Sequence, residues 1–152
     1  LRRLIDGLRR KYPCMVMDNE AGMEHLSRRT TDKVDLMLIT SDPTVRGVRS
    51  AARISNLIDG LKLEVKEKRL VINRCSDEEY PAAEVELVVQ TGASLAGCVP
   101  EDSLIAEYDL RGRPILTLPA ESPAVAAVEE LMKRLELDSK IRAYLRSREG
   151  EN

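Results

Sequence analysis

Short apolar segments that alternate with helical patterns constrain the fold of this chain more than any other feature. Residues 34–40, 69–75 and 94–99 are apolar enough for buried strands, and residues 14–18 (CMVMD) form an earlier segment of the same kind. Between them, apolar residues recur at helical spacing. Because parallel strands need crossover helices and lie buried between them, this alternation predicts a three-layer α/β domain with a mostly parallel sheet and helices on both faces.

Helix boundaries can be predicted from capping residues. Asp42 and Pro43 are suited to the N-cap and the first turn of one helix, and Gly60 is suited to its end. Ser122 and Pro123 have the same pattern and predict the start of a later helix. The apolar spacing in these helices and in the one between them predicts which side chains face inward. They are Val45, Val48, Ala52 and Leu61 in the first helix, Ala83, Leu87 and Val88 in the second, and Val125, Val128, Leu131 or Met132, and Leu135 in the last.

Composition limits the classes of function. A length of 152 residues fits one domain, 1–152, and a net charge of -2 gives no general attraction to nucleic acid or anionic lipid. Phe and Trp are absent, which disfavours base-stacking nucleic-acid modules. Three widely spaced cysteines and no apolar run near ~20 residues indicate a cytoplasmic protein with reduced thiols and no membrane span. Residues 137–152 form a small basic amphipathic segment, for which a packed or frayed terminal helix is favoured over membrane binding.

A polar group follows the first apolar segment. Asp18 closes that segment, so its carboxylate would stand at the edge of the sheet where a phosphate-bound Mg²⁺ could be held. Gly22 would let a backbone N–H approach a phosphate oxygen. The alternative is that Asp18 caps a turn and Gly22 supplies a left-handed residue. The spacing alone leaves both readings open.

Longer segments carry a resemblance. VMDNEAGMEHLSRRT, VDLMLITSDPTVRGVRSAARI, LVINR, GCVPED and RGRPIL occur in that order, and together they resemble the MinD/ParA group of P-loop ATPases. Within that group the run AGMEHLSR most resembles the CooC-type accessory ATPases of carbon monoxide dehydrogenase. The resemblance spans nearly the whole chain.

The resemblance implies a role for each matching residue. It makes Asp18 a Walker B-like catalytic acid that acts with Gly22. It also makes Asn73 the group that faces the adenine edge and Arg74 a further nucleotide-binding residue. A carboxamide suits that role because it can both donate and accept, although Asn73 read without the resemblance is a turn residue. The remaining implied residues are the switch residues Asn19, Glu20, Ala21 and His25 and the base-covering residues Pro100, Glu101 and Asp102. For His25, a capping or solvent-facing imidazole is an equal alternative.

The chain departs from the family pattern in its phosphate-binding loop. It contains no Gly-Lys pair and therefore no G-x-x-x-x-G-K-[ST] loop. The resemblance implies that this loop lies upstream, with a C-x-C pair that binds metal between two subunits. We therefore expect an N-terminally truncated P-loop domain with a gap or a compensating closure in its sheet. No metal site is expected within the chain, because Cys14, His25, Cys75 and Cys98 form no closely spaced pair.

The functional expectation follows from the resemblance. The intact homodimer would use ATP and Mg²⁺, with hydrolysis coupled to nickel insertion into carbon monoxide dehydrogenase, while this chain alone would be inactive. Nickel would bind through the upstream motif. The alternatives are a MinD/ParA-type positioning ATPase and a non-catalytic interaction module that retains the switch and base loops.

Overall fold

The structure is a computed structural model that describes residues 7–8, 11–12, 14–18, 33–60, 63–75, 80–137, 139 and 146. Three strands alternate with helices along the described chain. In order, the elements are β1 (Lys33–Ser41), α3 (Val45–Gly60), β2 (Glu64–Asn73), α4 (Ala82–Val89), β3 (Ala93–Val99), α5 (Ser103–Leu110), the 3-10 helix η1 (Ile115–Thr117) and α6 (Pro123–Arg134).

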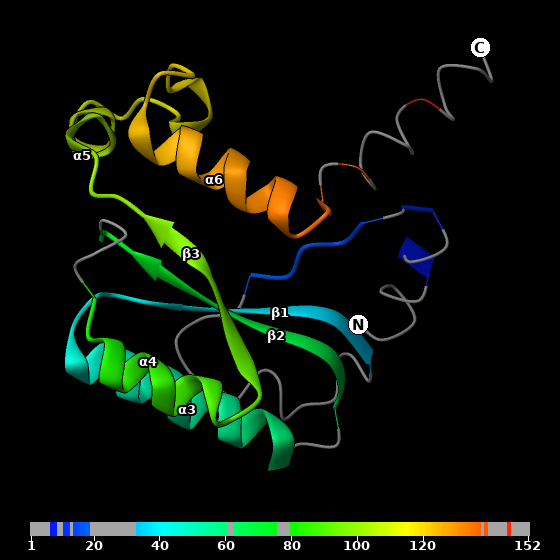
Figure 1. Ribbon diagram of the computed structural model, residues 1–152. Coiled ribbons are helices and arrows are strands. Elements are labelled where there is room, and N and C mark those ends of the chain that lie inside the picture. Colours follow the sequence, from blue (N-terminus) through cyan, green and yellow to red (C-terminus); the bar gives the residue numbers. More distant parts are fainter. Residues whose placement is uncertain are drawn as a thin grey trace.

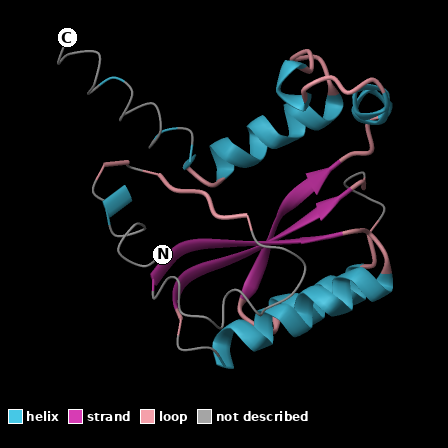
Figure 2. Ribbon diagram, turned by 180° about the vertical axis from the view of Figure 1, so that it is seen from behind, coloured by secondary structure: helices cyan, strands magenta, loops and turns pink. Residues whose placement is uncertain are grey.

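The strands form one parallel sheet in the order β1-β2-β3. Helices α3 and α4 lie side by side on one face, and α6 lies over β3 on the other (Figures 1 and 2). This arrangement confirms the predicted α/β fold with helices on both faces of a parallel sheet. The larger core cluster lies beneath α3 and α4, and its members include Ile39, Val48, Ile58, Leu70, Ile72 and Val88.

The prediction of a strand at residues 14–18 is wrong. These residues have no regular secondary structure, and Val16 is 87% exposed. A parallel strand needs a neighbour for its backbone hydrogen bonds. Within the described chain, β1 pairs with β2 alone, and segment 14–18 does not pair with the other edge of β1. The described sheet starts at β1, so the predicted gap or closure within the sheet stays a prediction.

The strand at 34–40 is confirmed as β1, but it is less buried than predicted. Ile39 is buried against α3, whereas its neighbour Leu38 is 44% exposed. Successive side chains of a strand point to opposite faces. Since α6 lies over β3 rather than β1, the second face of β1 is covered less well than the first.

The helix boundaries agree with the sequence at α6 and differ at α3. Ser122 caps α6 through its side chain, and Pro123 is its first residue, as predicted. Helix α3 begins two residues later than expected, because Thr44 Oγ1 accepts a hydrogen bond from Gly47 N at 3.0 Å and so replaces Asp42 as the cap.

The predicted inward-facing positions are confirmed in part. Val48, Val88 and Leu131 are buried as predicted, whereas Val45, Leu87 and Val128 are exposed. Helix α4 packs through Val85 and Val88, which turns Leu87 outward. Helix α6 buries Ala124 together with Leu131.

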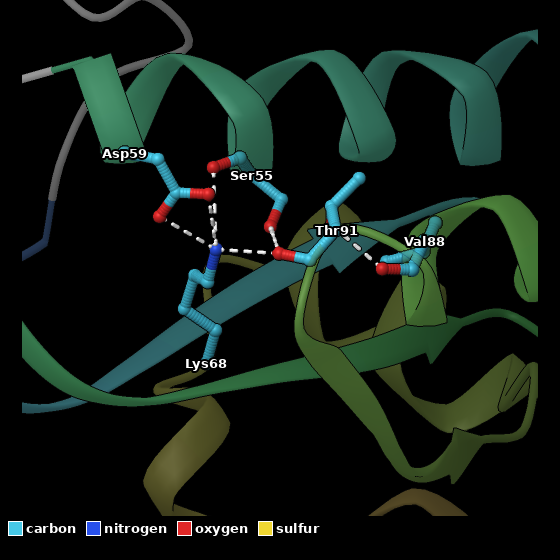
Figure 3. Close-up of polar contacts among 5 residues, drawn as sticks. All are labelled: Ser55, Asp59, Lys68, Val88 and Thr91. Carbon is cyan, nitrogen blue, oxygen red and sulfur yellow. Dashed lines mark hydrogen bonds and ion pairs between the residues drawn. The ribbon is translucent and has the colours of Figure 1, made fainter.

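A buried lysine joins α3 to the turn between α4 and β3 (Figure 3). Lys68 Nζ, on β2, donates hydrogen bonds to Asp59 Oδ1 at 2.8 Å and to the carbonyl oxygen of Thr91 at 2.7 Å. Ser55 Oγ also donates to the Thr91 carbonyl, at 3.4 Å. The ammonium group thus connects a carboxylate near the end of α3 with a backbone carbonyl just past the end of α4.

Candidate functional site

The carboxyl ends of the three strands define the candidate site. In a parallel sheet these ends meet at one edge, which is where ligands bind in folds of this type. The register pairs Ser41 with Ile72 and Asn73 with Val99, so β1, β2 and β3 end close together. Beyond the last pair, Cys75 N donates to the carbonyl oxygen of Val99 at 3.0 Å. This bond fixes the segment after β2 against the end of β3.

At the end of β1, Asp42 and Thr44 form a compact polar turn. Asp42 Oδ1 accepts from Thr44 N at 3.1 Å and from Thr44 Oγ1 at 2.6 Å. The Thr44 hydroxyl bond, followed by the Thr44 backbone bond, lowers the pKa of Asp42, and the nearby charge of Arg74 adds to this effect. A Cβ at Gly47 would lie 2.1 Å from Asp42 Oδ1, so this turn requires glycine there. Sequence reasoning missed Thr44 and Gly47, although the spacing T-x-x-G before a helix could have indicated this cap.

At the end of β2, Asn73 is exposed and its side chain is held by the backbone. Asn73 Oδ1 accepts from Arg74 N at 3.0 Å, so the carboxamide NH₂ is the group that the side chain offers to a ligand. Arg74 has a φ of 58°, a left-handed conformation that costs about 1 kcal/mol for a residue other than glycine. Such strain is concentrated at functional sites.

At the end of β3, the three predicted base-covering residues have different environments. Pro100 is half-buried and Glu101 is exposed. Asp102 is buried and caps α5, because its Oδ1 accepts from Leu104 N at 2.9 Å. A hydrogen bond from the Ser122 hydroxyl, followed by the bond from Leu104 N, lowers the pKa of Asp102. The Asp102 carboxylate thus faces helix ends inside the protein.

The remaining predicted site residues are either not at a strand end or not described by the structure. Asp18 is exposed and follows residues that form no strand, so its predicted position at a strand end is wrong. Asn19, Glu20, Ala21, Gly22 and His25 lie outside the described residues. The structure therefore brings together Asn73, Arg74 and the 100–102 loop, and leaves the predicted switch untested.

The described residues lack two features, a metal-binding cluster and a membrane-spanning helix. In that part of the chain, no three side chains of His, Cys, Asp or Glu are grouped so that they could hold a metal ion. Cys75 is buried, and Cys14 and Cys98 are partly buried. None of the helices that the structure describes has the length and apolarity to cross a membrane.

Known proteins resemble this chain in sequence and in structure. No protein-family model matches it. Over 135 residues it is 38% identical to an uncharacterized ATP-binding protein of Methanocaldococcus jannaschii, covering 89% of this chain and 53% of that protein. Over 107 residues it is 29% identical to the carbon monoxide dehydrogenase accessory protein CooC of Rhodospirillum rubrum, covering 69% of this chain and 38% of that protein. The MinD cell division protein of Aquifex aeolicus matches in structure, with a TM-score of 0.69, 23% identity and coverage of 89% of this chain and 58% of that one.

The parallel sheet, its covering helices and the polar strand ends define the class as an α/β domain with the fold of P-loop nucleotide hydrolases. The chain belongs to the MinD/ParA superfamily of these proteins and is related to CooC. It spans about half the length of the curated relatives it matches.

Proposed function

We propose that this chain supplies the base-binding side of the ATP site in a MinD/ParA-type ATPase. The observation that carries the proposal is the pairing of Asn73 with Val99, which brings the Asn73 carboxamide beside the loop that begins at Pro100. A carboxamide NH₂ can donate to a ring nitrogen of adenine, and the adjacent loop can cover one face of the base. The similarity to an ATP-binding protein over most of the chain also supports it.

Asp18 would supply a carboxylate for Mg²⁺ in this proposal. Carboxylate oxygens are ligands that Mg²⁺ prefers, and the resemblance to MinD/ParA ATPases is what supports this role for Asp18. When bound, Mg²⁺ neutralises negative charge on the phosphates. The residues that would cradle those phosphates are not in this chain, because it has no G-x-x-x-x-G-K-[ST] sequence. We infer that they belong to the part of the relatives that this chain does not span, and that the chain alone binds ATP weakly.

A substitution of Asp18 tests the catalytic part of the proposal. In the protein as its gene encodes it, Asp18→Asn is expected to lower kcat for Mg²⁺-dependent ATP hydrolysis roughly hundredfold, as for the loss of one group that stabilises transition-state charge. Asp35→Asn, at another exposed carboxylate, is the matched control and should hydrolyse ATP normally. Equal kcat values for ATP hydrolysis in the two variants would show that Asp18 is not catalytic.

For the cellular role we propose nickel delivery to carbon monoxide dehydrogenase by an ATP-dependent homodimer. The similarity to CooC supports this role. A positioning role is the second candidate, supported by the structural match to MinD. The test is nickel insertion into nickel-free carbon monoxide dehydrogenase, compared with ATP-dependent sedimentation on anionic lipid vesicles. ATP-dependent activation of the dehydrogenase supports delivery, and vesicle binding without activation supports positioning.

A further inference from the structure

Asp102 is buried between the first turns of two helices that are distant in sequence. Its Oδ1 accepts from Leu104 N at the start of α5, as described above. Its Oδ2 accepts from Ser122 Oγ at 2.5 Å and from Ala124 N at 3.4 Å at the start of α6. Ser122 is itself almost fully buried, and its Oγ accepts from Val125 N at 3.2 Å. One carboxylate therefore holds the N-termini of α5 and α6 together.

Helix α6 is also held at its other end. Leu131, near the end of α6, packs with Val71 and Ala96 of the sheet. The register of β2 and β3 shifts at this level, and a Cβ at Gly97 would lie 3.0 Å from Leu131 Cδ2. Close packing at this register shift thus fixes the C-terminal part of α6 on β3. Asp102 and Ser122 fix its N-terminus. The start of α6 lies near the segment that joins β3 to α5, which contains the 100–102 loop (Figures 1 and 2).

We propose that Asp102 and Ser122 are positioning residues that hold the Pro100–Glu101 backbone in the geometry that receives the base. This inference rests on the proposed function of the loop. Both Asp102 oxygens already accept hydrogen bonds inside the protein, so the carboxylate acts through the loop rather than by contacting the base. Only two residues separate β3 from Asp102, so fixing its side chain restricts the whole loop. A loop ordered before binding loses less conformational entropy when the ligand arrives.

The test compares Ser122→Ala with Ser103→Ala in the protein as its gene encodes it. Ser103 is the exposed first residue of α5 and serves as the matched control. Dissociation constants are measured for ATP and for inorganic tripolyphosphate, both with Mg²⁺. Ser122→Ala should weaken ATP binding about tenfold, as expected for losing hydrogen bonds to a charged group, and should leave tripolyphosphate binding unchanged. Ser103→Ala should change neither.

Two further measurements separate positioning from simple destabilisation. Asp102→Asn retains a good N-cap for α5 while disturbing the contact with α6, so it should fold and show the same loss of ATP binding. Amide hydrogen exchange at Glu101 and Leu104 should quicken in Ser122→Ala and remain normal in Ser103→Ala.

The outcomes distinguish this inference from the proposed function. If the unsubstituted protein binds ATP no more tightly than tripolyphosphate, the base makes no contribution and the proposed function fails, and the inference with it. If ATP is preferred but Ser122→Ala leaves that preference and the exchange of Glu101 and Leu104 unchanged, only the positioning role is overturned. An equal loss of affinity for ATP and tripolyphosphate would also overturn it.

Discussion

At the scale of single residues, two lysines on β2 show how burial decides what a charge contributes. The side chain of Lys68 is 11% exposed, and it satisfies Asp59 and the carbonyl of Thr91. That of Lys66 is 67% exposed and pairs with Asp35 at the surface. We expect Lys68→Met to lower the free energy of unfolding by about 2 kcal/mol, because the partly buried carbonyl of Thr91 loses its charged donor.

Lys66→Met is the matched control for this prediction. It removes a solvent-exposed ion pair and should change stability little. Urea unfolding followed by circular dichroism measures both variants. Similar unfolding midpoints for the two would show that the Lys68 contacts do not stabilise the fold.

Asp102 predicts a pH dependence of stability. Its pKa is held below the ordinary value of 3.8, mainly by the Ser122 hydroxyl. A carboxyl whose pKa is lower in the folded state stabilises that state above its unfolded pKa, and the contribution is lost as the pH falls through the folded pKa. Between about pH 5 and about pH 3, the urea midpoint should fall more steeply for the unsubstituted protein than for Asp102→Asn. Asp109→Asn, on the exposed face of α5, should retain the steep fall, and a steep fall in Asp102→Asn too would contradict the assignment.

Some residue roles could be predicted from the sequence and others could not. The resemblance, and the positions of Asn73 and the 100–102 loop after apolar runs, predict that both lie at the carboxyl ends of strands. The register of β2 and β3 places the ends of these strands side by side. The buried position of Asp102 depends on Ser122, which lies 20 residues away, so no local pattern could reveal it. The strain at Arg74 is likewise invisible in the sequence, because Arg is not a residue that favours a positive φ.

At the scale of elements, two glycines of α3 differ in what surrounds them. A Cβ at Gly60 would meet nothing within 4 Å, whereas one at Gly47 would overlap the Asp42 carboxylate. Alanine favours helices over glycine, so Gly60→Ala should stabilise the protein by up to about 1 kcal/mol. Gly47→Ala should instead destabilise it by about 2 kcal/mol, since the polar turn must move. Thermal unfolding of both variants checks the prediction, and a stabilised Gly47→Ala protein would show that the turn adapts freely.

The elements were predictable where local sequence determines them. The three strands of the sheet and the Ser122 cap of α6 agree with the apolar runs and capping residues. Segment 14–18 is as apolar as the strands of the sheet, but in the described chain it pairs with none of them. Leu87 and Val128 fit an inward pattern, yet packing against α3 and β3 favours other helix faces. In each case tertiary neighbours, which the local sequence does not specify, decided the outcome.

At the scale of the whole molecule, helices cover one face of the described sheet more completely than the other. Beneath α3 and α4 the core is closed, while Leu38 leaves part of the opposite face of β1 exposed. The chain spans about half the length of its relatives, and its sequence contains no phosphate-binding loop of the form G-x-x-x-x-G-K-[ST]. In the proposed ATP site, Asn73 and the 100–102 loop would contact the base. The phosphate contacts would come from the part of the relatives that this chain does not span.

The most direct test is a calorimetric titration of the protein, as its gene encodes it, with ATP and Mg²⁺. We predict micromolar binding, about -8 kcal/mol, that weakens about tenfold in Asn73→Ala through loss of the contact with the base. Asn56→Ala, at an exposed position of α3, should bind like the unsubstituted protein. The absence of ATP binding, or equal affinity in Asn73→Ala and Asn56→Ala, would contradict the proposal that Asn73 and the 100–102 loop bind the nucleotide base.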